Sequence, residues 1–227
     1  MANLPVLKLV VGNKNYSSWS MRPWVLARQA AIPFEEVQLH FDETDGGLSV
    51  AGIEPYSPTG KVPVLLVDGE PVWDSLAICE TLAELHPEKQ LWPAAADARR
   101  VARSVCAEMH SGFQGLRGAM PMNIRASYPG KGRTAQSEKD IERIIAIWTS
   151  CRSRFGRGGE FLFGRFGVAD AFYAPVATRF RTYAVSLPPA AQAYADALLA
   201  AAAVREWMEA GRSETEFVAA DEPYAAR

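Results

Sequence analysis

The most constraining feature of this chain is a proline that opens an apolar strand, followed eleven residues later by an Asp-Ser pair at the head of a helical pattern. Pro63 has no backbone N–H and cannot donate to a strand ladder. If the Val62–Pro63 bond is cis, the backbone of Val62 turns outward and can pair with an extended peptide. Asp74 and Ser75 then bring a carboxylate, a hydroxyl and free amide donors to a helix N-terminus. The pattern predicts a site that holds peptide backbone at one end and an amino-acid head group at the other.

Each half of this pattern also has a plainer explanation. Cis bonds are found at only about 5–6% of X-Pro positions in folded proteins, so Val62–Pro63 alone carries little weight. An Asp-Ser pair before a helix is most often only a cap. The two features in this order, with a matching serine-rich segment upstream, favour the binding interpretation.

The composition excludes several classes of partner. The 227 residues are 48% hydrophobic and 22% charged, with a formal net charge of −2, which suits one large domain or two small ones. Without a run of like charge, a nucleic-acid or membrane-surface partner has no electrostatic support. No stretch reaches the ~20 apolar residues of a membrane span, and the apolar run from Leu4 to Val11 is too short for a signal peptide. We expect a cytoplasmic protein with no nucleic-acid or membrane partner.

The cysteines predict neither disulfides nor a metal site. Cys79, Cys106 and Cys151 are odd in number and widely spaced, and each falls within a helical pattern. They are typical of reduced core cysteines in the cytosol. Cys106 and His110 are four residues apart on one helix, but no third or fourth zinc ligand follows at useful spacing.

The first 87 residues alternate between strand and helix patterns. Apolar, strand-like runs fall at 7–11, 34–39, 63–67 and 71–73. Helical spacing separates the first two runs and follows Asp74, and the segment 42–56 is mostly irregular. This order, β-α-β, a crossover segment and then β-β-α, predicts a small mixed sheet with helices packed on it.

Strand signals vanish after Pro93. Helical patterns run from 94 to about 118, along an apolar stripe from Ile141 to Phe155, from 167 to about 184, and from 191 to 211. We expect a linker at 87–93 and an all-α domain over 94–227.

Four segments together resemble one family, the cytosolic glutathione S-transferases, nearest its serine-type zeta and bacterial members. Residues 15–22 are similar to the family's serine-containing active-site turn, and 56–65 to its Asn-Pro-x-Gly-x-Val-Pro-x-Leu motif. Residues 73–78 are similar to its Glu/Asp-Ser-x-Ala-Ile motif, and 161–170 to the folding motif of its helical half. The resemblance implies a thioredoxin-like α/β domain at 1–87 with a βαβ-ββα mixed sheet, and an all-α helical domain at 94–227.

The resemblance implies glutathione as co-substrate, with no separate cofactor, and assigns residues to it. Ser17 is the expected hydroxyl donor to the glutathione thiolate, with Tyr16, Ser18 and Ser20 as alternatives and simple helix capping as the non-catalytic explanation. Val62, presented by Pro63, is expected to pair with the cysteinyl backbone. Asp74 and Ser75 are expected to hold the γ-glutamyl end, and Lys61 is a candidate for the glycyl carboxylate.

The electrophile pocket is expected between the two halves, on the first long helix of the second. Its candidate residues are His110, Gln114, Met122 and Arg125. Two positions depart from the family pattern. Trp19 stands where zeta members have cysteine, and Gly167 stands where the folding motif has a Ser or Thr cap.

The resulting expectation is a homodimeric transferase that joins the glutathione thiolate to small electrophiles. One alternative is a glutathione-dependent cis-trans isomerase of the maleylacetoacetate type, with Arg125 as the cation for the acid groups. The other is a non-catalytic binding module with the same fold.

Overall fold

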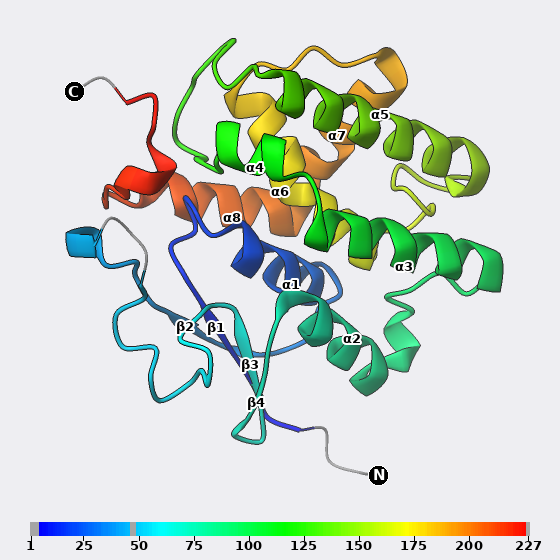
Figure 1. Cartoon of the computed structure of the whole chain (residues 1–227). Coiled ribbons are helices and arrows are strands. Elements are labelled where there is room, and N and C mark those ends of the chain that lie inside the picture. The colour runs from blue at the N-terminus through cyan, green and yellow to red at the C-terminus, as the bar shows by residue number, and fades with distance from the viewer. Residues whose placement is uncertain (1–4, 46–48, 226–227) are drawn as a thin grey trace.

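The computed structural model describes residues 5–45 and 49–225 (Figure 1). A four-stranded sheet has the order β2-β1-β3-β4. Its strands are β1 (Leu7–Val11), β2 (Glu35–Gln38), β3 (Val64–Val67) and β4 (Glu70–Val72). β1 pairs with β2 in parallel and with β3 antiparallel, and β3 pairs antiparallel with β4. The mixed sheet expected from the sequence is thus confirmed.

Alternation along β1 sets the two faces of the sheet. Leu7, Leu9 and Val11 belong to the main core, whereas Val10 points to a smaller cluster with Val64. Helices α1 (Ser18–Gln29) and α2 (Ser75–Leu85) belong with the main core. The smaller cluster packs under the crossover segment through Val50 and Ile53.

The second half of the chain is helical, as expected. It contains α3 (Ala96–Ser111), α4 (Gln114–Ala119), α5 (Ala135–Phe155), α6 (Val168–Thr182), α7 (Pro189–Ala200) and α8 (Ala202–Ser213). Three short 3₁₀ turns lie at Glu43–Asp45, Pro87–Lys89 and Ala219–Asp221. Helix α1 contacts the sheet on one side and α6 and α8 on the other, so one continuous core joins both halves (Figure 1). Within the described residues, no helix combines the length and the apolar character that a bilayer crossing needs.

Two expected helices are each divided in two. The stretch from 94 to 118 breaks at Gly112 and Phe113, where Phe113 takes a left-handed conformation with φ of 61°. The stretch from 191 to 211 breaks at Ala201, whose backbone is extended.

The presence of a glycine at the start of α6 is explained by steric crowding. A Cβ on Gly167 would lie 2.6 Å from the carbonyl oxygen of Leu91. Asp170 caps the helix instead, because its carboxylate accepts from the N–H of Gly167 at 2.9 Å and of Leu162 at 3.0 Å. The missing Ser or Thr cap is therefore replaced by a carboxylate that reaches back to the turn.

Candidate functional site

Two adjoining cavities lie where α1 and α2 begin. The first, here the Asp74 cavity, has a volume of about 470 Å³ and lies against Pro63, Trp73, Asp74 and Ser75. The second, here the Ser18 cavity, has a volume of about 330 Å³. It is lined by Tyr16, Ser17, Ser18, Trp19, Phe41, Val50, Gly60, Lys61, Val62, Arg117, Pro121, Arg179 and Asp221. Trp19, Lys61 and Val62 line both cavities.

Val62 lines both cavities, and its backbone groups are unpaired within the described structure. The Val62–Pro63 peptide bond is cis. Neither the N–H nor the C=O of Val62 bonds to any residue that the structure describes. Ser57 fixes the preceding turn, because its hydroxyl donates to the carbonyl of Lys61 and accepts from the N–H of Lys61. A strand-like peptide can therefore find a donor and an acceptor at one residue.

The N-terminus of α2 forms the polar end of the Asp74 cavity. Asp74 caps the helix by accepting from the N–H of Leu76 at 3.0 Å. Ser75 is fully buried, and its hydroxyl makes no hydrogen bond within the described residues. An unsatisfied buried hydroxyl at a helix N-terminus suits an anionic group of a ligand.

His110 joins the helical half to this end of the site. Its Nε2 donates to Asp74 Oδ2 at 2.9 Å, and its ring packs edge-on against Trp19. Burial lowers the pKa of His110 below its ordinary value, against the opposing effect of Asp74, so the imidazole is neutral at pH 7.

Three serines form a hydrogen-bonded turn at the start of α1. Ser17 is the N-cap and accepts from the N–H of Ser20 at 3.3 Å, while its hydroxyl donates to Ser20 Oγ at 2.7 Å. Ser20 Oγ also accepts from the N–H of Gly12 at 3.1 Å. Ser18 Oγ accepts from Nη2 of Arg179 at 3.2 Å.

Arginines make this region cationic. Trp19 lies between two guanidinium groups, with Arg22 at 4.2 Å and Arg117 at 4.7 Å from its ring centroid. Arg22 is fully buried and also stacks on Phe172, but none of its side-chain nitrogens makes a hydrogen bond in the described structure. Burial lowers the pKa of Arg22 well below its ordinary value. The arrangement favours an anion in the adjoining cavity.

Comparison with known proteins identifies the family. Residues 16–85 match a model described as the N-terminal domain of glutathione S-transferase, and residues 132–210 match its C-terminal domain. The maleylacetoacetate isomerase of Rattus norvegicus is 30% identical over 76% of this chain and 78% of its own length. The chain belongs to the glutathione S-transferase family.

Other relatives agree with this family membership. The maleylacetoacetate isomerase of Dictyostelium discoideum is 31% identical over 50% of this chain, which spans about half (52%) of that relative's length. A glutathione transferase homologue from Burkholderia gl BGR1, solved with bound glutathione, has a TM-score of 0.68 at 21% identity. It covers 92% of this chain and 100% of its own, and it shows that the fold is that of the family.

In this member of the glutathione S-transferase family, the nine residues expected near glutathione or its thiol come together from three motifs. At least one cavity is lined by each of Tyr16, Ser17, Ser18, Lys61, Val62, Pro63, Asp74 and Ser75. Ser20 lines neither, but its hydroxyl oxygen accepts from the hydroxyl of Ser17. The residues expected around the electrophile are dispersed. His110 reaches the site through Asp74, whereas Gln114 is exposed and donates to the carbonyl of Ser111 at 3.4 Å. Met122 is buried in the core and lines neither cavity.

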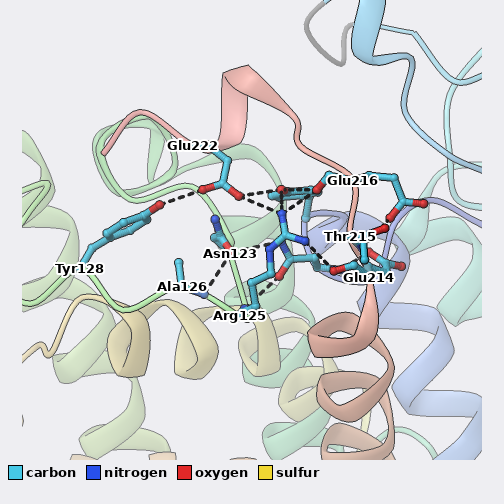
Figure 2. A network of polar contacts seen from close by, with 10 residues as sticks. Asn123, Arg125, Ala126, Tyr128, Glu214, Thr215, Glu216 and Glu222 are labelled. Atoms are coloured by element: carbon cyan, nitrogen blue, oxygen red, sulfur yellow. Dashed lines mark hydrogen bonds and ion pairs between the residues drawn. The ribbon is translucent and has the colours of Figure 1, made fainter. Parts of the chain in front are cut away.

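Arg125 belongs to a separate polar network with the C-terminal segment (Figure 2). Its guanidinium donates to Glu222 Oε1 at 3.2 Å, to the hydroxyl of Tyr16 at 2.6 Å and to the carbonyl of Glu214 at 2.5 Å. Tyr128 donates to the other oxygen of Glu222 at 2.8 Å. This network fixes the C-terminal segment against the turn that carries Ser17, and Arg125 does not line either cavity.

Several lining residues were not expected from the sequence. Arg117, Arg179 and Asp221 reach the Ser18 cavity from α4, α6 and the C-terminal 3₁₀ turn. No local motif marks them, because their proximity to the serine turn exists only in the folded chain. Trp73 could have been found, since it directly precedes Asp74.

The described residues contain no cluster of His, Cys, Asp and Glu side chains that could hold a metal ion. Cys79, Cys106 and Cys151 are buried and unpaired. Burial raises the pKa of each thiol, that of Cys151 to about 11, which makes them poor nucleophiles.

Proposed function

We propose that this chain is a glutathione transferase that conjugates the thiolate of reduced glutathione to small electrophiles. The observation that carries the proposal is the unpaired backbone of Val62 between a capped helix N-terminus on one side and a serine turn on the other. Glutathione has matching parts in the same order: a γ-glutamyl head, a peptide backbone and a thiol.

Each end of glutathione finds a complementary group. The ammonium of the γ-glutamyl end lies near Asp74, and its carboxylate accepts from the hydroxyl and N–H of Ser75. The N–H and C=O of Val62 pair with the cysteinyl residue. Lys61 approaches the glycyl carboxylate, and the thiol enters the Ser18 cavity.

The reaction needs the sulfur as an anion. A free thiol has a pKa of about 8.5, and lowering that value by about two units takes roughly 2.7 kcal/mol of selective stabilisation. The N-terminus of α1, its hydroxyls and the arginines around Trp19 are available to supply it. The thiolate then forms a bond to an electrophilic carbon, and a leaving group departs with its electron pair or, at an activated double bond, the adjacent carbon takes a proton from water.

The direct test measures glutathione binding by calorimetry and conjugation of an activated aryl halide. Loss of the buried hydroxyl in Ser75→Ala is expected to weaken glutathione binding by about tenfold or more, because that hydroxyl would serve a charged group. Ser104→Ala, on the exposed face of α3, is the matched control and should bind normally. Binding without conjugation by the wild-type protein would instead support a non-catalytic binding module.

A second candidate function is glutathione-dependent cis-trans isomerisation of a maleyl-type diacid. Arg117 and Arg179 in the Ser18 cavity favour it, as do the names of the curated relatives. The thiolate would add to the double bond, the resulting single bond would rotate, and elimination of the same thiolate would restore the double bond. Arg117→Met should then lower diacid isomerisation far more than conjugation of a neutral electrophile; equal losses would count against the isomerase.

We further propose a cytoplasmic homodimer on the basis of the family resemblance. Sedimentation of a species of twice the 24.8 kDa chain mass would support the dimer.

A further inference from the structure

Among the described residues that line the Ser18 cavity, Asp221 supplies the only carboxyl group. It lies on the C-terminal 3₁₀ turn, Ala219–Asp221, and reaches the same cavity as the serine turn of α1. Asp221 is partly buried, and its carboxyl makes no hydrogen bond within the described part of the chain. The group is therefore free to act on a molecule that enters the cavity.

The segment that carries Asp221 is anchored on both sides. On one side Val218 is fully buried, and its carbonyl accepts from the N–H of Asp221 at 3.0 Å. On the other side Glu222 accepts from the hydroxyls of Tyr16 at 2.7 Å and Tyr128 at 2.8 Å (Figure 2). These contacts keep the Asp221 carboxyl at the wall of the cavity.

The surroundings of Asp221 favour its protonated form. Burial raises the pKa of Asp221 to about 6, with a further contribution from Glu222 and against the opposing effect of Arg179. A thiolate in the same cavity would raise that pKa further, because two like charges disfavour each other. The other charged or titratable groups that share this cavity or interact with Asp221 are Tyr16, Lys61, Arg117 and Tyr183.

One class of glutathione conjugation needs a proton donor. When a thiolate adds to an activated double bond, the sulfur–carbon bond forms and the π electron pair moves onto the neighbouring carbon and its activating carbonyl group, as an enolate. The product is complete only when that carbon receives a proton. Water is a weak source, with a pKa of about 15.7, whereas a carboxylic acid such as Asp221 is a far stronger acid.

We propose that Asp221 is the general acid that protonates this carbon when glutathione adds to an activated double bond. The O–H bond of the carboxyl breaks as the C–H bond forms, and the carboxylate then regains a proton from solvent. The inference rests on the proposed function and adds to it a residue from the C-terminal segment. Substitution of an aryl halide needs no such proton, because the halide leaves with its electron pair.

The test compares wild-type protein with Asp221→Asn on two electrophiles, diethyl maleate for addition and an activated aryl halide for substitution. The variant should lose about tenfold or more in kcat/KM for addition, the lower part of the range for general acids, while substitution changes little. Retained substitution also shows that the variant is folded. Glu216→Gln is the matched control: it makes the same carboxyl-to-amide change in the same segment but outside both cavities, and should leave both rates unchanged.

Product analysis follows the proton directly. An enolate that is not protonated can rotate and expel the thiolate, which gives diethyl fumarate instead of the adduct. The share of diethyl fumarate should therefore rise in Asp221→Asn.

The ratio of the addition rate to the substitution rate isolates Asp221, because both reactions use the same thiolate. In wild-type protein this ratio should fall as the pH rises above the pKa of Asp221, about 6, and in Asp221→Asn it should stay constant. Equal losses in both reactions, a wild-type ratio that ignores pH, or a wild-type protein that accepts the aryl halide but not diethyl maleate overturns the inference alone. So does an Asp221→Asn variant with an unchanged addition rate and an unchanged share of diethyl fumarate. A wild-type protein that conjugates neither electrophile overturns the proposed function as well.

Discussion

Arg22 is a residue whose placement opposes stability. Its guanidinium is fully buried between Trp19 and Phe172 without a hydrogen bond to any described residue. Cation–π contacts offset only part of the cost of burying that charge. We explain the presence of this buried guanidinium by the positive potential that it adds beside the serine turn.

Arg22→Met tests this explanation, because methionine fills similar space without the charge. We expect the free energy of unfolding to stay the same or to rise by up to about 4 kcal/mol. We also expect the pKa of the thiol of bound glutathione to rise. Arg117→Met is the matched control: its guanidinium donates to the carbonyls of Met109 and Gly112, so its loss should destabilise by about 1–3 kcal/mol. Chemical denaturation measures the free energy of unfolding of both variants. A larger loss of stability for Arg22→Met than for the control would contradict the argument.

At the residue scale, the sequence revealed those parts of the site that are local in the chain. Val62, Pro63, Asp74 and Ser75 lie within two short motifs, so neighbouring residues in the chain are enough to mark them. Arg179 could not be found in this way, because its contact with Ser18 joins residues 161 positions apart.

Among the elements, the C-terminal segment depends most on a single carboxylate. Glu222 accepts hydrogen bonds from Tyr16, Tyr128 and Arg125 (Figure 2). Burial alone would raise the pKa of Glu222, but these hydrogen bonds hold it below the ordinary value of 4.5. A carboxylate with a lowered folded-state pKa contributes stability that is complete above pH 4.5 and is lost as the pH falls through the folded-state value.

Glu222→Gln should therefore remove part of the acid sensitivity of the protein. We expect the variant to lose about 1–3 kcal/mol near neutral pH and to approach the wild-type stability as the pH falls below 4.5. Thermal unfolding followed by circular dichroism across that range measures the difference. Parallel curves for the two proteins at all pH values would show that the Glu222 carboxylate is not the group responsible.

The helix breaks show what the sequence could and could not predict about elements. Gly112 was a visible signal for the break between α3 and α4. Nothing local marks the break at Ala201, which lies in an alanine-rich stretch of good helix formers. At the start of the new helix, the N–H of Ala203 donates to Gln29 Oε1, a partner 174 positions away in α1.

At the scale of the whole molecule, the last helix supports the loop that leads into the site. Trp207 in α8 donates to the carbonyl of Lys14 at 2.9 Å and packs edge-on against Trp24 of α1. Glu214, just beyond α8, accepts from the N–H groups of Lys14 and Asn15 at 2.6 and 2.9 Å. The loop before α1 and the segment around α8 therefore determine together the position of the serine turn.

Gly211 of α8 also packs against this loop. A Cβ at that position would lie 3.0 Å from the carbonyl carbon of Lys14 and 3.1 Å from the nitrogen of Asn15, and both are backbone atoms that cannot rotate away. Gly211→Ala should therefore displace the loop, cost about 1–3 kcal/mol of stability and weaken glutathione binding, although Gly211 lines neither cavity. Gly118→Ala in α4 is the control: no atom lies within 4 Å of its added Cβ, so helix propensity should leave it neutral or stabilise it by up to about 1 kcal/mol. Calorimetry of both variants, with and without glutathione, compares the effects. Normal binding by a destabilised Gly211→Ala would show that α8 supports the fold without positioning the site.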